Sequence, residues 1–265
     1  MRFIDQMNHT LAFNTTPKRI ISLVPSQTEL LYYLGVTPIA QTVFCIHPKD
    51  QFQSANKIGG TKKLQLDKIR ALQPDLIIGN KEENVVDQIN VLRNEFPVWM
   101  SDVNTLDDAY KMIQSVGDII DESHQSEILN TKIEQAFNRL FAPKSTKPKV
   151  LYLIWQDPFF GIGANTFIHE IMETAGFNNV LQNQERYPEL TVQDIHDLDP
   201  EYIFLSSEPF PFKQSHCDTL SLLFTKSKIM LVDGELFSWY GNRLLDTPLY
   251  IEGLISDIRS YESQS

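Results

Sequence analysis

Short runs of apolar, mostly β-branched residues alternate with helical patterns along most of the chain. In the first half the pattern predicts strands at 19–24, 39–43, 75–79 and 97–100, with helices at 28–34, 66–72 and 84–95. In the second half it predicts strands at 149–154, 179–181, 201–205 and 228–232, with helices at 167–175, 192–198 and 247–261. Alternating strands and helices are typical of parallel sheets covered by helices. We therefore expect an α/β fold made of two similar halves.

A long helical stretch separates the halves, with one helix predicted at 105–121 and a second at 122–141. The second helix has no Gly or Pro, and at 1.5 Å per residue it would reach about 30 Å, enough to connect two lobes. Pro143 and Pro148 end it. We expect an N-terminal α/β lobe at 1–121, a connecting backbone helix at 122–142 and a C-terminal α/β lobe at 143–265.

The charge and the hydropathy pattern exclude two classes of partner. The chain has 23 Lys and Arg against 34 Asp and Glu, a net charge of -11, and no basic run that would bind a phosphate backbone. No segment approaches the roughly 18 apolar residues of a membrane span. The first twenty residues show no signal peptide, and two cysteines far apart in the sequence suit a reducing compartment. These two observations favour the cytoplasm.

The turn after the first predicted strand combines Pro25 with a capping-box pattern, because Glu29 follows Ser26 by three positions. It lies at the carboxyl end of a strand, where open α/β sheets bind ligands. The pattern is compatible with a ligand contact and equally with a plain helix start.

Two other segments have polar residues with more than one interpretation. Cys45 and His47 would point the same way in an extended segment and could offer two ligands to a metal, although pocket lining or a core position is the favoured interpretation. Because two ligands do not hold a structural metal, no protein-built metal site is predicted. Glu82 and Glu83 follow a strand at a predicted helix start. They either stabilise the helix through its dipole, or face the cleft or a partner protein.

Nucleotide and catalytic motifs are absent. The segments 58–63 and 161–166 lack the spacing of a P-loop and the third glycine of a dinucleotide fingerprint, and the second is better explained as a turn into a helix capped by Asn165 or Thr166. No G-x-S-x-G or H-E-x-x-H occurs. The sequence therefore predicts a protein that is not an enzyme.

Aromatic residues follow several predicted strands of the second half, and they suit the flat face of a macrocycle: Trp155, Phe159, Phe210, Phe212, Phe237, Trp239 and Tyr240. Arg243 follows them and would pair with a carboxylate or phosphate of such a ligand.

RIISLVPSQTELLYYLG, followed by IGGTKKLQLDKIRALQPDLIIG, resembles the amino-terminal lobe of the helical-backbone solute-binding proteins of ABC importers, and its cobalamin-binding members look closest. KVLYLIWQDPFFGIGANTFIHEIMETAGFNNVL and DPEYIFLSSEP are similar to the carboxyl-terminal lobe of this family. The resemblance covers about residues 18–261. It implies two Rossmann-like lobes with parallel sheets, joined by one long backbone helix.

The resemblance also implies a function and a set of ligand contacts. Members of the family work outside the cytoplasm, where they bind cobalamin, haem or ferric siderophores in the cleft between their lobes and deliver them to a permease. They have no intrinsic cofactor. The alternative is a cytosolic sensor or carrier of such a chelate without a permease, and a weaker one is an enzyme using Cys45, His47 and Glu83. Carried over by position, the ligand-binding residues are Pro25, Ser26, Cys45, His47, Thr61, Lys81, Glu82, Glu83, Asn84, Trp155, Asn165, Thr166, Glu208, Trp239, Tyr240 and Arg243.

Overall fold

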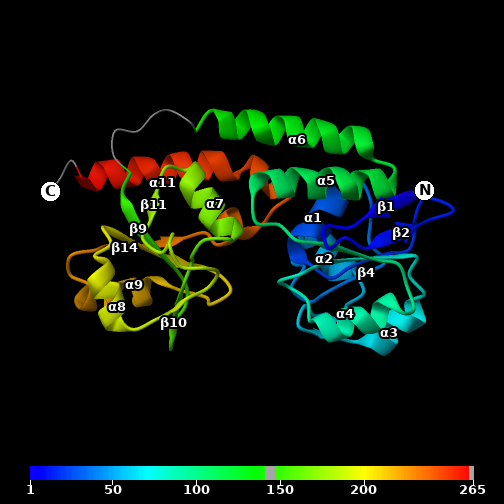
Figure 1. The fold of residues 1–265 in the computed structure, drawn as a ribbon, viewed down its shortest axis with the longest axis horizontal. Helices are drawn as coiled ribbons and strands as arrows, with labels where there is room; N and C mark the ends of the chain where they lie inside the picture. Colours follow the sequence, from blue (N-terminus) through cyan, green and yellow to red (C-terminus); the bar gives the residue numbers. More distant parts are fainter. Residues whose placement is uncertain (141–146, 263–265) are drawn as a thin grey trace. The chain divides into compact units, whose positions relative to one another are not determined.

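The computed structural model describes residues 1–140 and 147–262, and the chain divides into two compact units (Figure 1). Unit 1 consists of Met1–Val103, Asp107–Glu134 and Trp239–Leu245. Unit 2 consists of Asn104–Leu106, Gln135–Ser238 and the chain from Asp246 onward. The predicted boundaries at 121 and 142 and the predicted cleft between lobes remain predictions, and residues 142 and 143 lie outside the described residues.

Unit 1 is built on a parallel four-stranded sheet with the order β4-β3-β7-β8. Its strands are β3 (Ile20–Ser22), β4 (Ala40–Gln41), β7 (Leu76–Asn80) and β8 (Val98–Ser101). They lie at the four predicted positions, because these short apolar runs are buried on both faces of the sheet, as parallel strands require. Numbered by their order in the chain, the strands run 2-1-3-4 across the sheet.

Helices and short strands complete unit 1. The helices are α1 (Pro25–Tyr33), α2 (Lys49–Ser54), α3 (Leu66–Leu72), α4 (Val86–Arg93) and most of α5 (Leu106–Ile120), with the 3₁₀ helix η1 (Asn242–Leu245). The short strands are β1 (Arg2–Ile4), β2 (Thr10–Ala12), β5 (Gly59–Gly60) and β6 (Lys63–Leu64). Ile21, Leu23, Ile69 and Ile77 form part of a core cluster in this unit.

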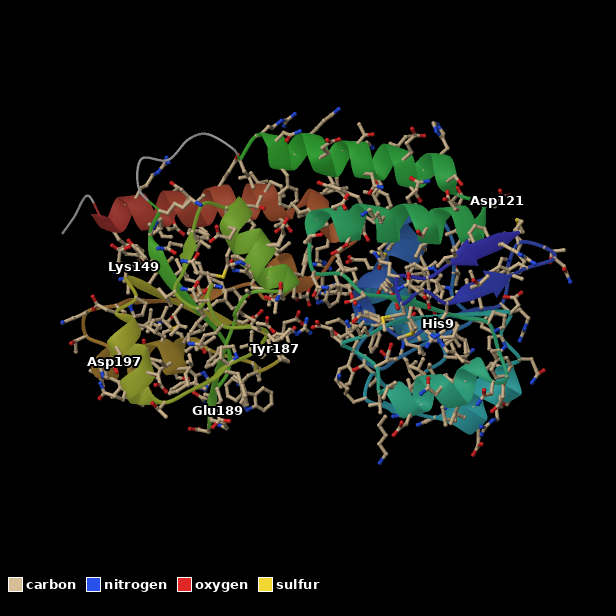
Figure 2. All side chains as sticks on the ribbon, viewed as in Figure 1. His9, Asp121, Lys149, Tyr187, Glu189 and Asp197 are labelled. Carbon is tan, nitrogen blue, oxygen red and sulfur yellow. The ribbon has the colours of Figure 1, made fainter. Side chains whose placement is uncertain are left out.

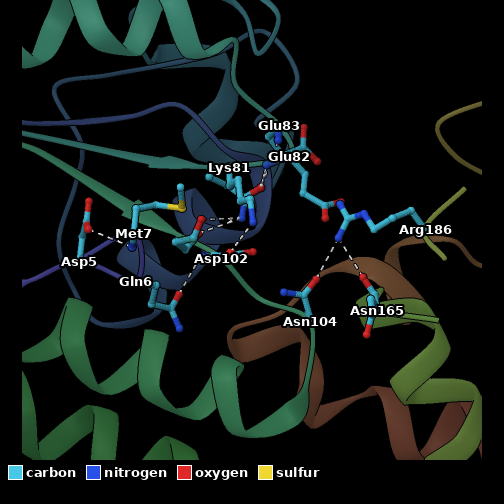
Figure 3. Close-up of polar contacts among 12 residues, drawn as sticks. Asp5, Gln6, Met7, Lys81, Glu82, Glu83, Asp102, Asn104, Asn165 and Arg186 are labelled. Atoms are coloured by element: carbon cyan, nitrogen blue, oxygen red, sulfur yellow. Dashed lines mark hydrogen bonds and ion pairs between the residues drawn. The ribbon is translucent and has the colours of Figure 1, made fainter. Parts of the chain in front are cut away.

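The β1–β2 hairpin was not predicted, and it is fixed to the edge strand β8 by the buried carboxylate of Asp5. This carboxylate accepts from the amides of Met7 at 2.9 Å, His9 at 2.7 Å and Met100 at 3.2 Å, and from Arg93 at 3.0 Å. Figure 3 shows its contact with Met7. The neighbouring Gln6 adds a bond from its amide to the Met100 carbonyl at 3.1 Å, so Asp5 and Gln6 together hold the hairpin on β8.

Unit 2 repeats the strand order of unit 1 in a mixed sheet. The parallel strands β9 (Lys149–Trp155), β11 (Asn178–Asn179), β13 (Tyr202–Ser206) and β14 (Lys228–Val232) are arranged as β11-β9-β13-β14, again 2-1-3-4 in chain order. Two antiparallel strands that were not predicted, β10 (Phe159–Gly161) and β12 (Glu189–Leu190), extend the sheet beside β9. The α/β class with parallel sheets is confirmed, and the antiparallel strands are an addition to it.

The helices of unit 2 are α7 (Phe167–Thr174), α8 (Val192–Leu198), α9 (Gln214–Leu223), α10 (Glu235–Ser238) and α11 (Thr247–Glu262). The sequence pattern missed α9 and the short α10. Leu151, Leu153, Ile195, Ile203 and Phe212 belong to the core cluster of this unit.

The long helical stretch is present as α5 and α6 (Ser123–Asn138), which meet at Asp121, labelled in Figure 2. Asp121 adopts a left-handed φ of 67°, which ends α5 and lets the chain reverse. The chain of α6 passes from unit 1 to unit 2 between Glu134 and Gln135. The predicted last residue of this helix, Phe141, lies outside the described residues. Within the described part, no helix has the length and apolar character needed to cross a membrane.

Candidate functional site

The strand order gives each unit one topological switch point, the kind of position at which open α/β sheets bind ligands. In a parallel sheet ordered 2-1-3-4, the connections after the first and third strands leave in opposite directions, which opens a crevice outside the carboxyl ends of these two strands. In unit 1 these are the loops after β3 and β7, and in unit 2 the loops after β9 and β13. We call each pair of loops the switch point of its unit.

The first loop of unit 1 contains Pro25 and Ser26, and the predicted capping box is wrong. Helix α1 begins at Pro25, and its N-cap is Val24, which makes no side-chain capping bond. Proline is favoured in the first helical position because it needs no amide partner there, so Ser26 lies one position inside the helix. Glu29, which would have reached back to Ser26, instead contacts Arg243.

Arg243 forms two hydrogen bonds of 2.9 Å to the carboxylate of Glu29. Its guanidinium carbon also lies 4.9 Å from the ring centre of Trp239. The sequence predicted that Arg243 would pair with a carboxylate or phosphate of the ligand. The structure shows a carboxylate of the protein in that role, and a ligand contact by Arg243 remains a prediction.

The second loop of unit 1 is a tight turn organised by two asparagines. The Oδ1 atom of Asn80 accepts from the amides of Glu82 at 2.8 Å and Glu83 at 3.1 Å. The Oδ1 atom of Asn84 accepts from the Asn80 amide at 2.9 Å, and its Nδ2 atom donates to the Thr61 carbonyl at 3.2 Å. These contacts bring Thr61, Asn84 and the two glutamates together at the end of β7. The helix-dipole interpretation requires the two glutamates to lie in the first turn of α4. Helix α4 starts only at Val86, so neither glutamate does.

The charges of this turn are partly compensated within unit 1. Lys81 pairs with Asp102 at 2.6 Å, as Figure 3 shows, and Lys62 donates to the Glu82 carbonyl. Burial raises the pKa of Glu83, nearby Lys62 lowers it, and Glu82 raises it. Glu83 therefore holds its proton more readily than an exposed glutamate.

Cys45 and His47 lie in the loop after β4, and their side chains have different surroundings. The segment is a turn and not a strand, so the alternation that placed both side chains on one side does not apply. Cys45 is fully buried, its thiol lies 3.1 Å from both the Thr28 and the Thr42 hydroxyls, and burial raises its pKa. The ring of His47 instead packs edge-on against Trp239, 5.6 Å between centres. Among the described residues no group of three His, Cys, Asp or Glu side chains could hold a metal ion.

Tyr240 links the loop of Ser26 to the end of β8. Its side chain is 7% exposed, and its hydroxyl is hydrogen-bonded to the side chains of Ser26 and Ser101. Burial raises the pKa of Tyr240 well above its usual value, and the charge of Glu83 raises it further. The phenol is therefore a neutral hydrogen-bonding group.

The sequence did not single out Gln27 or Ser101, although both belong to this network. Ser101 Oγ accepts from Asn80 Nδ2 at 3.0 Å and from Gln27 Nε2. Both residues are fully buried, so their polar atoms need partners inside the protein. The signal that could have found them is a polar side chain placed directly at the end of a buried strand. We call Ser26, Gln27, Asn80, Ser101 and Tyr240 the polar network.

In unit 2 the switch point carries rings in place of the polar network. Trp155 ends β9, is 40% exposed, and packs edge-on against Phe210 at 5.4 Å between ring centres. Phe210 in turn packs against Phe212 at 4.7 Å. The expectation that the aromatic residues after the strands lie at the surface is wrong for most of them. Phe212, Phe237, Trp239 and Tyr240 are buried, and Trp155 is the most exposed of the aromatic residues predicted for the site.

The other predicted contacts of unit 2 have clear local roles. Thr166 caps α7 by accepting from the His169 amide, which confirms one of the two expected caps. Asn165 has a left-handed φ of 58°, and its carbonyl accepts from Arg186 at 2.8 Å, a bond that Figure 3 shows beside the one to Asn104. Glu208, at the second switch-point loop, accepts from the Ser238 hydroxyl at 2.8 Å.

Comparisons with known proteins agree with this architecture. The family described as "Periplasmic binding protein" matches residues 20–225. A vitamin B12-binding protein of Vibrio parahaemolyticus is 26% identical over 199 residues, 73% of this chain and 72% of that protein. An uncharacterised ABC transporter substrate-binding lipoprotein of Bacillus subtilis is 23% identical over 211 residues, 75% of this chain and 67% of that protein. The structure of a periplasmic heme-binding protein of Roseiflexus sp. RS-1 superposes with a TM-score of 0.76 at 19% identity, covering 89% of this chain and 98% of that one.

Proposed function

We propose a function from one premise, that the chain belongs to the periplasmic binding protein family, whose match spans residues 20–225. The protein is a non-catalytic substrate-binding protein of an ABC importer, and it holds a metal chelate at the switch points of its two units. A permease partner is part of the same proposal. The relatives are named as binding proteins, one of them as part of an ABC transporter. A cytosolic carrier that works without a permease is therefore not favoured.

The observation that carries the ligand class is the chemistry of the two switch points. Unit 2 presents the exposed ring of Trp155 with Phe210 behind it, a surface that stacks on a flat macrocycle. Unit 1 presents Glu82 and Glu83 in the turn that Asn80 holds, next to the hydroxyl and amide groups of the polar network, and such groups form hydrogen bonds with amides. A ligand with both a broad apolar face and a rim of amides meets both requirements.

The charges distinguish among the chelates of the family. Lys81 and Arg243, two cations of unit 1 among the predicted contacts, are already paired with Asp102 and Glu29. Glu82 and Glu83 lie in the same turn as Lys81, so this part of unit 1 has no excess of positive charge, and it favours a chelate with amide groups over one with carboxylates. A corrinoid has amide side chains around its ring, whereas haem carries two propionates. We therefore propose cobalamin as the first candidate and haem or a ferric siderophore as the next.

The test is a titration of the purified protein with cyanocobalamin, hemin and a ferric hydroxamate chelate, followed by absorbance and calorimetry. We expect cyanocobalamin to bind one to one and most tightly. Removing a stacking ring by Trp155→Ala should weaken its binding about tenfold. Leu222→Ala is the matched control. Leu222 is 82% exposed and lies near the end of α9, which leads to the amino end of β14 and not to the carboxyl ends where the switch point lies.

Two results would contradict the proposal. Failure of all three chelates to bind would remove the function itself. Tight cyanocobalamin binding that is equally strong in the wild type, Trp155→Ala and Leu222→Ala would keep the function and remove the ring of Trp155 from the site.

A further inference from the structure

The segment Trp239–Leu245, which we call the strap, belongs to unit 1, although the chain on both sides of it belongs to unit 2. It enters from Ser238 and leaves at Asp246. Seven residues that cross between units twice must be held by contacts strong enough to offset their conformational entropy. Three kinds of contact hold the strap.

The first contact is the ion pair of Arg243 with Glu29 of α1. It is bidentate, with both hydrogen bonds at 2.9 Å, and the two side chains are only 17% and 15% exposed. A paired, partly buried guanidinium and carboxylate with this fork geometry form a far stronger contact than an exposed ion pair. The guanidinium also lies over the ring of Trp239, so the pair is linked to the first residue of the strap as well.

The second contact is the close approach of the strap backbone to α1. Gly241 has a φ of +110°, a conformation that residues with a side chain rarely adopt. A Cβ atom at this position would lie 3.4 Å from the Leu30 Cβ and 3.5 Å from the Ser26 carbonyl oxygen. The strap backbone therefore lies directly on the first turns of α1.

The third contact is Tyr240, which brings its hydroxyl between Ser26 and Ser101. Ser26 lies in the first turn of α1, at the switch point of unit 1, and Ser101 ends β8, the strand beside β7. The strap thus supplies a side chain to the polar network from a distant part of the sequence. Neither Glu29 nor Arg243 belongs to this network, but both determine where Tyr240 lies.

We propose that Glu29 and Arg243 are positioning residues that hold the strap on α1, so that Tyr240 completes the polar network that forms unit 1's share of the ligand site. The consequence for ligand affinity rests on the proposed function. The positioning itself does not, and it can be measured without ligand. Loss of the ion pair releases the strap, withdraws the Tyr240 hydroxyl and weakens binding.

The experiment compares Glu29→Gln and Arg243→Lys with the wild type in two measurements. Amide hydrogen exchange of peptides covering 239–245 reports how firmly the strap is held. Calorimetric titration with cyanocobalamin reports the ligand site. We expect Glu29→Gln to speed exchange in the strap and to weaken binding, each about tenfold or more, because a charge-assisted bidentate bond is lost. Arg243→Lys keeps the charge but not the fork, so its effects should be intermediate.

The matched control is Glu95→Gln, since Glu95 also accepts a bidentate contact from an arginine, Arg70, away from the strap. It should change neither the exchange of 239–245 nor binding. The reciprocal double variant Glu29→Arg with Arg243→Glu restores an ion pair and should recover slow exchange. Melting temperature is recorded for every variant, so that a general loss of stability is recognised by faster exchange outside the strap.

The outcomes separate the two proposals. Unchanged exchange in Glu29→Gln would overturn the positioning role. Faster exchange with unchanged cyanocobalamin affinity would overturn the link to the ligand site. If the wild type binds none of the chelates, the proposed function fails, and the exchange results still decide whether Glu29 and Arg243 hold the strap.

Discussion

Units 1 and 2 have the same strand order but different interiors. Twelve of the sixteen buried polar side chains in the described part of the chain belong to unit 1. Most of the ring-to-ring contacts lie in unit 2, where Phe204 alone packs against Tyr152, Phe177 and Phe237. The comparison teaches that the strand order places the switch points, whereas the side chains buried beneath them decide what each switch point can bind.

The two interiors also predict different responses to substitution. A buried polar group is costly when its partner is removed, because its desolvation is no longer compensated. A ring in an apolar core loses contact area and leaves a cavity, a cost that depends on how well the neighbours close around it. Unit 1 should therefore be most sensitive to loss of charge, and unit 2 to loss of volume.

The largest effect is expected for Asp5→Ala in unit 1. The substitution leaves the Arg93 guanidinium and the amides of Met7, His9 and Met100 without their common acceptor. Removing one partner of a buried ion pair costs about 3–5 kcal/mol of unfolding free energy. Urea unfolding, with hydrogen exchange in β8 as a local readout, measures the loss.

The control for this prediction is Asp194→Ala in unit 2. Asp194 forms a capping box with Thr191 at the start of α8, but it is exposed to solvent. Asp194→Ala should therefore lower the free energy of unfolding much less than Asp5→Ala does. Equal losses would show that burial of the carboxylate in unit 1 is not what makes Asp5 important, and the contrast between the units would be wrong.

An intermediate effect is expected for Phe204→Leu in unit 2. Phe204 is fully buried, with its ring centre 5.4 Å from that of Phe177 and 6.4 Å from those of Tyr152 and Phe237. Leucine keeps the site apolar but loses these ring contacts and some volume, at a cost of about 1–2 kcal/mol. Thermal and urea unfolding measure it. A loss as large as that of Asp5→Ala would mean that unit 2 tolerates changes in volume no better than unit 1 tolerates loss of charge.

The strands of both parallel sheets were predictable from the sequence, and the reason is local. Each is a short apolar run followed by a turn and a helical pattern, so neighbouring residues suffice to recognise it. The order 2-1-3-4 was not predicted, because right-handed connections are compatible with other strand orders as well, and it comes from the pairing of the strands in the structure. Most predicted ligand contacts are close to a switch point.

The remaining features depend on contacts that sequence patterns do not record. Glu29 and Arg243 are 214 residues apart, and nothing near either residue indicates the other. For Cys45, pocket lining or a core position was favoured over a metal site, but the sequence did not decide between pocket and core, because the direction of its thiol depends on a loop with no periodic pattern. The hairpin at Asp5 was missed because its strands, RFI and TLA, are mostly exposed and have no continuous apolar run of the kind that marks the buried strands.

The smallest effect is expected for Glu83→Gln, and it tests whether burial at the switch point of unit 1 affects titration. Burial raises the pKa of Glu83 above its usual 4.5. The folded state therefore favours the protonated acid, and stability is lost as the pH rises from the unfolded pKa through the folded pKa. The glutamine variant does not titrate, so it should melt about 1–2 °C higher than the wild type at pH 7, and the difference should vanish near pH 4.

Glu95→Gln is the control, because its shift has the opposite sign. The hydrogen bonds from Arg70 lower the pKa of Glu95, so its contribution to stability is present at neutral pH and is lost as the pH falls through the folded pKa. The Glu95→Gln variant should therefore melt lower than the wild type at pH 7, and this difference should also close in acid. Melting curves from about pH 2 to pH 7 measure both variants, because the loss for Glu95 lies below its usual pKa. Shifts of the same sign in the two variants would show that burial does not govern the titration of Glu83, and the raised pKa at the switch point of unit 1 would be wrong.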